Sequence, residues 1–545
     1  MLFQEEDLTF DTFEHINLTG RSLRAIPVVL HTRADTITTL NLSRNPMLEI
    51  PLDFIQSCIT LRELRLSNMA MKRVPQSVRH CATLFRLDLS CNRIVELNEA
   101  GLDQIPKLAT LNVQNNRMEK LPWYFPRLRM LKHLNISNNK FRNLPAVVCE
   151  MVSLVDLDIS FNMISELPEE IGQLKLLDRL IIVGNQVQKF PDECKGLISL
   201  RDLDCRRNNI LDLSVVCMLP KLEILRADHN TIYALDLSLG PSLKTLDASH
   251  NDITQLTLVP GPVGVCSPYA LISLDISNAK LSSLDEFALG QLSSLETLKL
   301  DHNSFRYIPE SLGELSQLKR LSCSDNALDA LPSSIGRLQR LETLDAHNNS
   351  LVELPISLWN CASLCQINVT SNQLGIWHDP PTSTGNPTDS PPLSSRSIPI
   401  HPERKTSTAG SIGSQLGRAI PPLAHSLERL YLGENNLTDD VLHSLTILKE
   451  LHVLNLSFNE IQEIPASFFR NLNKLEELYL SGNKLTSIPT EDLHRLTRLS
   501  VLFLNGNKLQ TLPHELGKIQ SLAVLDVGSN VLKYNINNWQ FDWNW

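Results

Sequence analysis

Residues 154–176 read LVDLDISFNMISELPEEIGQLKL, a stretch in which aliphatic residues and one asparagine recur at fixed spacing. The positions Leu154, Leu157, Ile159, Asn162, Ile164 and Leu167 fit the pattern L-x-x-L-x-L-x-x-N-x-L. Leu157 and Ile159 alternate with polar residues, and a period of two places them on one face of a short strand. A single strand cannot bury that face, so the stretch predicts a stack of similar copies.

Copies of this stretch fill most of the chain, which is typical of leucine-rich repeats. The first three are irregular, with Arg21, Asn45 and Met69 at the turn position. The turn residues then recur at Asn92, Asn116, Asn139, Asn162, Asn185, Asn208, Asn230, Asn251, Asn303, Asn326, Asn349, Asn372, Asn435, Asn459, Asn483, Asn507 and Asn530. We therefore predict an α/β leucine-rich-repeat solenoid, or horseshoe, of about 21 repeats with a parallel β-sheet on its concave face.

The outer face has little room for full helices, because turns that are 21 to 24 residues apart leave only short connections. We expect short helical turns there, since the Leu-Pro pair after many turns disfavours helix. The stretch TDDVLHSLTILKEL, residues 438–451, is the exception and predicts a true helix capped near Thr438. Stacked turn asparagines should satisfy the backbone groups left open where the strands end.

Composition divides the chain into five segments. Residues 1–15 are a lead-in, and 16–377 hold the first run of repeats. Residues 378–425 are rich in Pro, Ser, Thr and Gly without an apolar period, which predicts a disordered insertion. Repeats resume over 426–533. The last segment, 534–545, ends in WQFDWNW, and we expect these aromatic residues to pack on the last repeat or on a domain beyond this chain.

Charge and motifs exclude several classes of function. A formal charge of -10 argues against a nucleic-acid-binding surface. The eleven cysteines are scattered, which indicates reduced thiols and a cytoplasmic protein. The acidic first residues do not form a signal peptide, and no apolar run is long enough to span a membrane. Phosphate-loop, HExxH and GxSxG motifs are absent from the sequence, so we predict no catalytic, metal or cofactor site in this chain.

The outward-facing residue of successive strands forms a column that changes character along the chain. Its centre is acidic, with an island at Arg179, Ile181, Arg206 and Arg226. Near its C-terminal end it carries Tyr431, Tyr479 and Phe503. Arg and aromatic residues often anchor interfaces, so we predict that both groups bind partners. The alternatives are a solvated acidic surface and aromatic side chains that only pack against one another.

The insertion carries two candidate phosphorylation sites. Arg404 to Ser407, RKTS, fits a kinase that requires basic residues, and Ser390 precedes a proline. We therefore predict Ser390 and Ser407 as acceptors, where phosphate would add charge to the loop.

The ending SLAVLDVGSNVLKYNINNWQFDWNW resembles the junction in fungal adenylate cyclases where the repeats meet the next domain. In that family a Ras-association domain precedes the repeats, and phosphatase-like and cyclase domains follow them. The resemblance implies that this chain is a regulatory region. It would receive GTP-bound Ras and a co-chaperone, reach the inner face of the membrane only through Ras, and control cyclic AMP synthesis. The magnesium-dependent catalytic domains would lie outside this chain.

Ras effector surfaces are acidic in that family, so complementary charge favours the arginine island as the docking site. Two other hypotheses stay open. A free-standing scaffold, either a Ras adaptor or a phosphatase-targeting protein, would need a polar cap after Asn530, where the sequence instead offers aromatic residues. An enzyme would need a site that the motifs do not provide.

Overall fold

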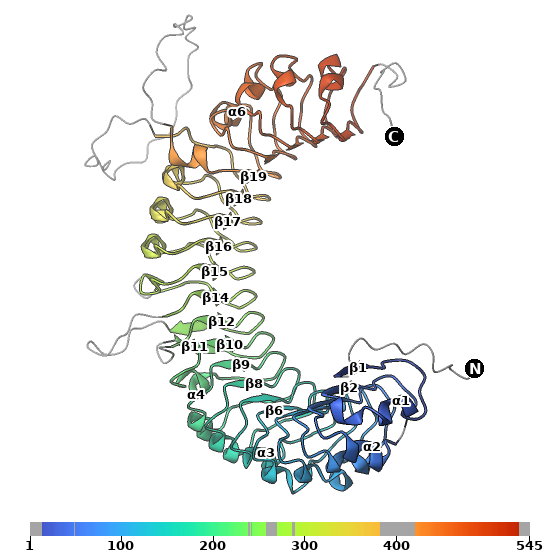
Figure 1. The fold of residues 1–545 in the computed structure, drawn as a ribbon. Helices are drawn as coiled ribbons and strands as arrows, with labels where there is room; N and C mark the ends of the chain where they lie inside the picture. Colours follow the sequence, from blue (N-terminus) through green and yellow to red (C-terminus); the bar gives the residue numbers. More distant parts are fainter. Residues whose placement is uncertain are drawn as a thin grey trace, which may run out of the picture. The chain divides into compact units, whose positions relative to one another are not determined.

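The computed structural model describes residues 14–47, 49–237, 240, 242–257, 270–285, 289–381 and 420–533. Ser390, Ser407, the aromatic segment 534–545, and most of the lead-in and insertion lie outside the described residues. The chain divides into two compact units, Met1–Ser304 and Phe305–Trp545. We call them the first and second units and describe each by itself (Figure 1).

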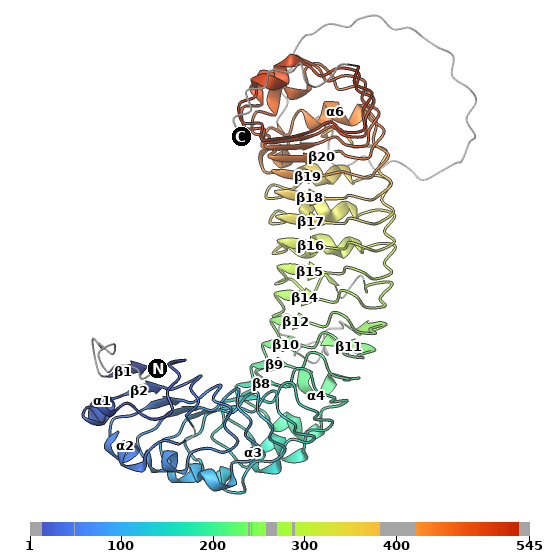
Figure 2. The same cartoon turned by 90° about the vertical axis from the view of Figure 1, so that its right-hand side faces the viewer.

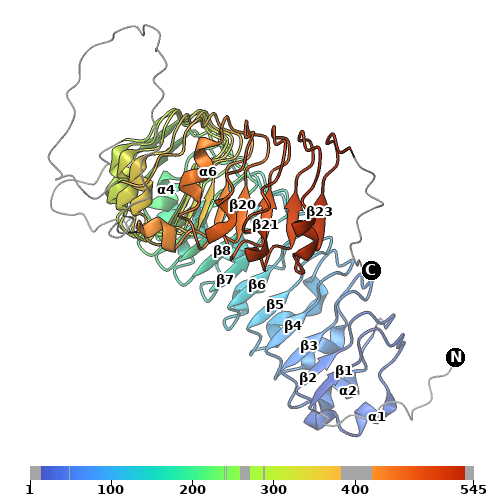
Figure 3. The same ribbon diagram turned by 90° about the horizontal axis from the view of Figure 1, so that it is seen from above.

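The first unit is built on short parallel strands that follow one another in chain order (Figures 1 and 3). They are β1 (His15–Asn17), β2 (Thr39–Asn41), β3 (Glu63–Arg65), β4 (Arg86–Asp88), β5 (Thr110–Asn112), β6 (His133–Asn135), β7 (Asp156–Asp158), β8 (Arg179–Ile181), β9 (Asp202–Asp204), β10 (Ile224–Arg226), β12 (Thr245–Asp247), β14 (Ser273–Asp275) and β15 (Thr297–Lys299). The register pairs equivalent residues, as in Leu157 with Leu180. A second pair, β11 (Ala234–Asp236) and β13 (Gln255–Thr257), was not predicted.

The second unit repeats this plan with β16 (Arg320–Ser322), β17 (Thr343–Asp345), β18 (Gln366–Asn368), β19 (Arg429–Tyr431), β20 (Val453–Asn455), β21 (Glu477–Tyr479), β22 (Val501–Phe503) and β23 (Val524–Asp526) (Figure 2). The strands of the main sheet in the two units number 21 among the described residues. The predicted α/β repeat fold, its parallel strands and its repeat number are therefore confirmed.

Short helices lie on the side of each coil opposite the strands (Figures 1 and 2). The α-helices are α1 (Val28–His31), α2 (Leu52–Ser57), α3 (Ala146–Cys149), α4 (Ser214–Cys217) and α6 (Asp440–Leu445). The 3-10 helices are η2 (Ala34–Thr36), η3 (Gln76–His80), η4 (Asn98–Ala100), η5 (Leu102–Gln104), η6 (Phe125–Arg127), η7 (Glu169–Gln173), η8 (Asp192–Gly196), η10 (Glu310–Glu314), η11 (Ser333–Arg337), η12 (Ile356–Asn360), η13 (Pro422–His425), η14 (Phe468–Asn471), η15 (Leu493–Arg495) and η16 (His514–Lys518). Many begin directly after a proline in extended conformation, such as Pro168 before η7, so short helical turns form as predicted.

The core lies between the strands and these helices. The middle residue of most strands is a buried leucine, as Leu157 and Leu203 illustrate. At the turn, Asn162 Nδ2 donates to the carbonyl oxygens of Ile136, Ile159 and Ser160 at 3.0 to 3.2 Å. Its Oδ1 accepts the backbone N–H of Phe141 at 3.1 Å. Each ladder asparagine thus joins its own repeat to the preceding one, because buried polar groups need partners.

Two predicted boundaries need correction. Residue 15 already belongs to β1. The insertion predicted at 378–425 is too long, because the His378 carbonyl accepts a bond from Trp359 and Leu423 is fully buried in η13. The helix predicted within residues 438–451 is confirmed: it spans Asp440–Leu445, and its N-cap residue is Asp439, next to Thr438. Asp439 makes no cap bond within its own helix because its carboxylate accepts two backbone N–H groups of the next repeat.

Candidate partner-binding surfaces on the strand face

We call the side of each unit that carries the outward-pointing strand residues the strand face. At the third strand position of the main sheet, each described Asp and Asn accepts the backbone N–H two residues further on, which is an Asx turn. These residues are Asn17, Asn41, Asp88, Asn112, Asn135, Asp158, Asp204, Asp247, Asp275, Asp345, Asn368, Asn455 and Asp526. The Asp and Asn residues of the predicted acidic column therefore serve first to terminate the strands, through their Asx turns.

The remaining third positions hold other residue types. They are Arg65, Ile181, Arg226, Lys299, Ser322, Tyr431, Tyr479 and Phe503. Five of the seven residues predicted from the sequence as partner-binding are in this group. At these positions the strand ends without an Asp or Asn oxygen, so the side chain makes no Asx turn.

Arg179 and Ile181 of β8 line a hollow of about 270 Å³ that extends over β5 to β8 of the first unit. Its other walls include His133, Asp156 and Asp158. Arg179 is 49% exposed, and its Nε lies 3.7 Å from Asp202 Oδ2 on the next strand. The structure therefore brings these two predicted residues together in a shallow, mainly polar depression.

Arg206 and Arg226 do not line this hollow and instead form ion pairs. Arg206 binds both carboxylate oxygens of Asp204 at 2.8 Å, and its Nε lies 3.7 Å from Asp228. The hydrogen bond to Asp204 raises the pKa of Arg206. Arg226 Nη1 donates to Asp202 Oδ1 at 2.7 Å, so Asp202 lies between Arg179 and Arg226. The predicted basic island is thus a network in which each arginine is held by aspartate.

The acidic side of the same face is compensated in a similar way. Lys299 Nζ binds Asp275 at 3.0 Å, a bond that raises the pKa of the lysine. Burial raises the pKa of Asp247, with a smaller contribution from the neighbouring carboxylates of Asp275 and Asp228. The first unit therefore presents alternating charges on its strand face, most of them paired.

The second unit presents aromatic side chains instead. The rings of Tyr479 and Phe503 meet edge to face, with centroids 5.2 Å apart and an interplanar angle of 77°. The Tyr479 hydroxyl donates to Glu477 Oε2 at 2.8 Å. Burial, together with Glu477, raises the pKa of Tyr479 to about 12, so this hydroxyl stays protonated. Tyr431 does not join the pair, because Asn455 lies between it and Tyr479 in the strand register.

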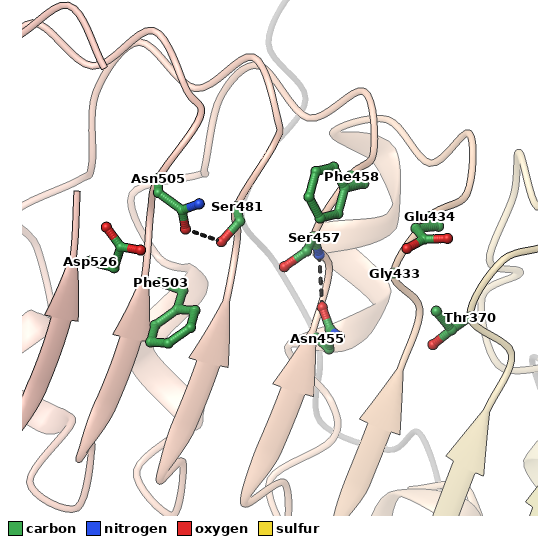
Figure 4. Close-up of a pocket in the computed structure, with 10 residues that line it drawn as sticks. All are labelled: Thr370, Gly433, Glu434, Asn455, Ser457, Phe458, Ser481, Phe503, Asn505 and Asp526. Atoms are coloured by element: carbon green, nitrogen blue, oxygen red, sulfur yellow. Dashed lines mark hydrogen bonds between the residues drawn. The ribbon is translucent and has the colours of Figure 1, made fainter. Parts of the chain in front are cut away.

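Next to this pair, the second unit has a hollow of about 310 Å³ (Figure 4). It is lined by Thr370, Gly433, Glu434, Asn455, Ser457, Phe458, Ser481, Phe503, Asn505 and Asp526. Figure 4 shows Phe458 and Phe503 separated by Ser457 and Ser481, with Glu434 toward one end and Asp526 toward the other. Only Phe503 of these residues was predicted from the sequence.

Phe458 carries a signal that sequence reasoning missed. It directly precedes ladder residue Asn459, and its φ of +56° is left-handed, as in the equivalent residues Asn115 and Asn138. Polar residues or glycine fill most of these turn positions, so a phenylalanine that is 56% exposed is unusual. Its ring lies across Gly482, where an added Cβ would be 2.4 Å from the ring.

The described residues offer no cluster of three or more His, Cys, Asp or Glu that could hold a metal ion. Their cysteines are free thiols, most of them buried, and burial raises the pKa of Cys194 and Cys361 to about 12. Within the described part of the chain, no helix is long and apolar enough to cross a bilayer.

Comparison with known proteins agrees with the repeat pattern. A family model described as "Leucine rich repeat" matches residues 59–118 and 449–509, and one described as "Leucine-rich repeat region" matches residues 98–308.

Two similar relatives are fungal proteins named adenylate cyclase. The protein of Mycosarcoma maydis is 46% identical over 550 residues, covering 98% of this chain and 22% of the relative. That of Podospora anserina is 37% identical over 616 residues, covering 99% of this chain and 28% of the relative. This chain thus spans about a quarter of the length of these relatives.

Solved structures show the same fold. A leucine-rich-repeat protein of Leptospira interrogans is 26% identical with a TM-score of 0.54, covering 63% of this chain and 90% of its own. YopM of Yersinia enterocolitica is 23% identical with a TM-score of 0.56, covering 96% of this chain and 88% of its own.

Proposed function

Since this chain belongs to the leucine-rich-repeat proteins and is the repeat region of a fungal adenylate cyclase, we propose that it receives a GTP-bound GTPase of the Ras type. Binding would then be relayed to phosphatase-like and cyclase domains of the same protein, which convert ATP to cyclic AMP with magnesium. The chain itself contributes recognition and no chemistry. Its contact with the membrane would be indirect, through the GTPase, and a co-chaperone would be a further partner.

The observation that carries this proposal is the arginine network on the strand face of the first unit. Arg179 is on β8, Arg206 follows β9 and Arg226 is on β10, and their side chains are 49%, 42% and 36% exposed. Each guanidinium can therefore reach a second carboxylate while it keeps its own. An acidic effector surface would find three cations at fixed positions, which favours fast and oriented docking.

The aspartates in this network have two opposing effects. Asp202 and Asp204 lower the net positive charge, so long-range attraction is weaker than an unpaired basic patch would give. They also hold the arginine side chains in one orientation, which reduces the entropy lost on binding. Ile181, next to Asp204 in the register, adds an apolar contact to this surface.

The test is binding of the purified 545-residue chain to Ras loaded with GTP or GDP, measured by biolayer interferometry. We expect GTP-selective binding that the double variant Arg206→Glu plus Arg226→Glu lowers at least about tenfold. The variant Arg206→Gln plus Arg226→Gln should also weaken binding and avoids repulsion with Asp204. Circular dichroism would show that both variants fold.

A matched control is Arg320→Glu plus Arg429→Glu, which makes the same change in charge at two exposed strand positions of the second unit. It should leave binding unchanged. If both double variants weaken binding equally, the effect is net charge and the assigned surface is wrong. If the parent chain binds neither form of Ras, the proposal fails in favour of a scaffold with other partners.

A further inference from the structure

We propose that the hollow on the strand face of the second unit binds an arginine side chain of a basic partner peptide, between Phe458 and Phe503. This proposal concerns a partner of a different chemical class from the acidic GTPase above and does not depend on it. It rests on the shape of the hollow, on the two rings, and on carboxylates that have no cation.

The hollow exists because small residues occupy its floor. Gly433, Ser457 and Ser481 stand two residues after the ends of β19, β20 and β21. At Gly433 an added Cβ would lie 3.3 Å from the Asn455 side chain and from the Ser457 carbonyl, so a larger residue would crowd this floor. Its volume of about 310 Å³ is at the lower end of ligand sites, which suits a side chain better than a large ligand.

The two rings are held in place before any partner arrives. Phe458 lies on Gly482, and Phe503 packs edge to face against Tyr479. Phe458 follows β20 and Phe503 is on β22, so their backbones are separated by two strand spacings, or roughly 10 Å. Figure 4 shows the two rings apart, with Ser457 and Ser481 between them, and we place the flat side chain in this part of the hollow.

The charge around the hollow is negative and uncompensated. Among the described residues, neither Glu434 nor Asp526 forms an ion pair. Glu434 accepts a hydrogen bond from Ser371 Oγ at 2.6 Å, and Asp526 accepts the Gly528 N–H at 2.9 Å. Nearby Glu477 accepts a hydrogen bond from the Tyr479 hydroxyl and forms no ion pair within the described part of the chain. Arg429 is the one basic residue at the strand-face positions of β19 to β23. A cationic partner would supply the missing charge.

Arginine fits this combination better than lysine or an apolar residue. Its planar guanidinium stacks on aromatic rings and carries five N–H donors, whereas the ammonium of lysine is compact and strongly hydrated. An apolar side chain would use the rings and leave the carboxylates unpaired. The carboxylates of Glu434 and Asp526, toward the two ends of the hollow, would attract a guanidinium held between the rings.

The experiment measures fluorescence anisotropy of a labelled Gly/Ser nonapeptide with two arginines against the full chain. The same peptide with both arginines changed to citrulline, lysine or leucine provides the comparison. Citrulline keeps the shape of arginine and removes its charge, so we expect about tenfold weaker binding with it. Lysine should be intermediate and leucine the weakest. Binding of the arginine peptide should fall with salt.

The variants are chosen to keep the fold. Phe458→Asn is compatible with the backbone because Asn115 and Asn138 adopt the same left-handed conformation. Phe503→Asn places at β22 the residue type that Asn455 provides at β20. Each should weaken arginine-peptide binding about tenfold. Glu434→Gln and Asp526→Asn should each weaken it about threefold, since both keep a hydrogen-bonding oxygen.

The matched control is Phe161→Asn in the first unit. Phe161 also precedes a ladder asparagine with φ +51° and lies against a glycine, Gly184. It should leave peptide binding unchanged. Equal binding of the arginine and citrulline peptides, tighter binding of the leucine peptide, full binding by both phenylalanine variants, or no binding of the arginine peptide would each overturn the proposal.

Discussion

At the third strand position the first unit has Arg226 and Lys299, each bound to an aspartate of a neighbouring strand, whereas the second unit has Tyr479 and Phe503, whose rings contact each other. The backbone is the same in both cases, and neither pair makes the Asx turn that the consensus residue provides. The first unit uses the freed position for charge pairs, and the second uses it for aromatic surface. One backbone position thus carries two kinds of surface chemistry.

This contrast suggests that partners of the two units differ in kind. The paired charges of the first unit favour a partner with a charged surface that can replace or extend the existing ion pairs. The affinity for such a partner should depend strongly on salt concentration. The aromatic pair and adjacent hollow of the second unit favour insertion of a side chain. The predictions below test where the two units are alike and where they differ.

The largest effect should come from the ladder, where the units are alike. Asn162→Ala in the first unit and Asn483→Ala in the second each leave several buried backbone groups without a partner. We expect each to lower the free energy of local opening by about 3 kcal/mol, measured by hydrogen exchange in the flanking repeats. A clearly smaller loss in one unit would show that the ladder is not equivalent in both.

A smaller effect should distinguish the charge pairs from the aromatic surface. A double-mutant cycle of Arg206→Ala with Asp204→Asn should give a coupling of about 1 kcal/mol that shrinks in 1 M salt. The cycle of Tyr479→Phe with Glu477→Gln should give a coupling that salt changes little, because the tyrosine is neutral. Thermal unfolding of the parent and the six variants would measure both couplings. Equal salt dependence would contradict this difference.

Restoring the consensus should have a smaller effect still. Ile181→Asn in the first unit and Phe503→Asn in the second each supply an oxygen for the Asx turn and remove apolar contact. We expect the gained turn hydrogen bond and the lost apolar contact to offset each other, so that the free energy of unfolding changes by no more than about 1 kcal/mol. Phe503→Ala, which supplies no oxygen, should be more destabilising than Phe503→Asn. The reverse order would mean that the turn bond contributes nothing at this position.

The smallest effect concerns pH. The folded-state pKa of Asp247 is raised above its ordinary value of 3.8, so the carboxylate form is disfavoured by the fold. The stability linked to this group is present below pH 3.8 and is lost as pH rises through the folded pKa. Asp247→Asn keeps the turn oxygen and stays neutral, so its melting temperature relative to the parent should be higher at pH 7 than at pH 4. An equal difference at both values would contradict the raised pKa.

The sequence predicts the array well because two signals repeat in nearly every copy. Alternating aliphatic residues such as Leu157 and Ile159 define the buried side of each strand, and the ladder asparagines mark each turn. The ion pair between Arg206 and Asp204 is harder to predict from the sequence. The sequence gives the charge of the two side chains but not the distance between them. The helix begins next to the predicted cap near Thr438, but the carboxylate of its N-cap residue Asp439 bonds to the next repeat, a contact that no local pattern encodes.

The hollow in the second unit was missed for a different reason. Gly433, Ser457 and Ser481 create it by having small side chains, and nothing in a single repeat marks them as functional. Phe458 could have been found by comparing the residue before each ladder asparagine across repeats. Tyr431 has the residue type and the strand position of Tyr479, but Asn455 lies between the two in the register, so position in the column alone does not show which rings are in contact.

The ladder also has a consequence for protein engineering. Asn435 Nδ2 reaches back to the Val369 carbonyl at 3.0 Å across 66 positions, while Asn372 makes the equivalent bond to Ala346 at 3.0 Å across 26. The length of the intervening chain thus does not change the geometry of this bond. A long intervening segment is tolerated because the entropy cost of closing a loop grows only slowly with its length. Residues 382–419 therefore mark a position where a fluorescent protein could be grafted into the array, with its two ends joined to repeats that already hold each other.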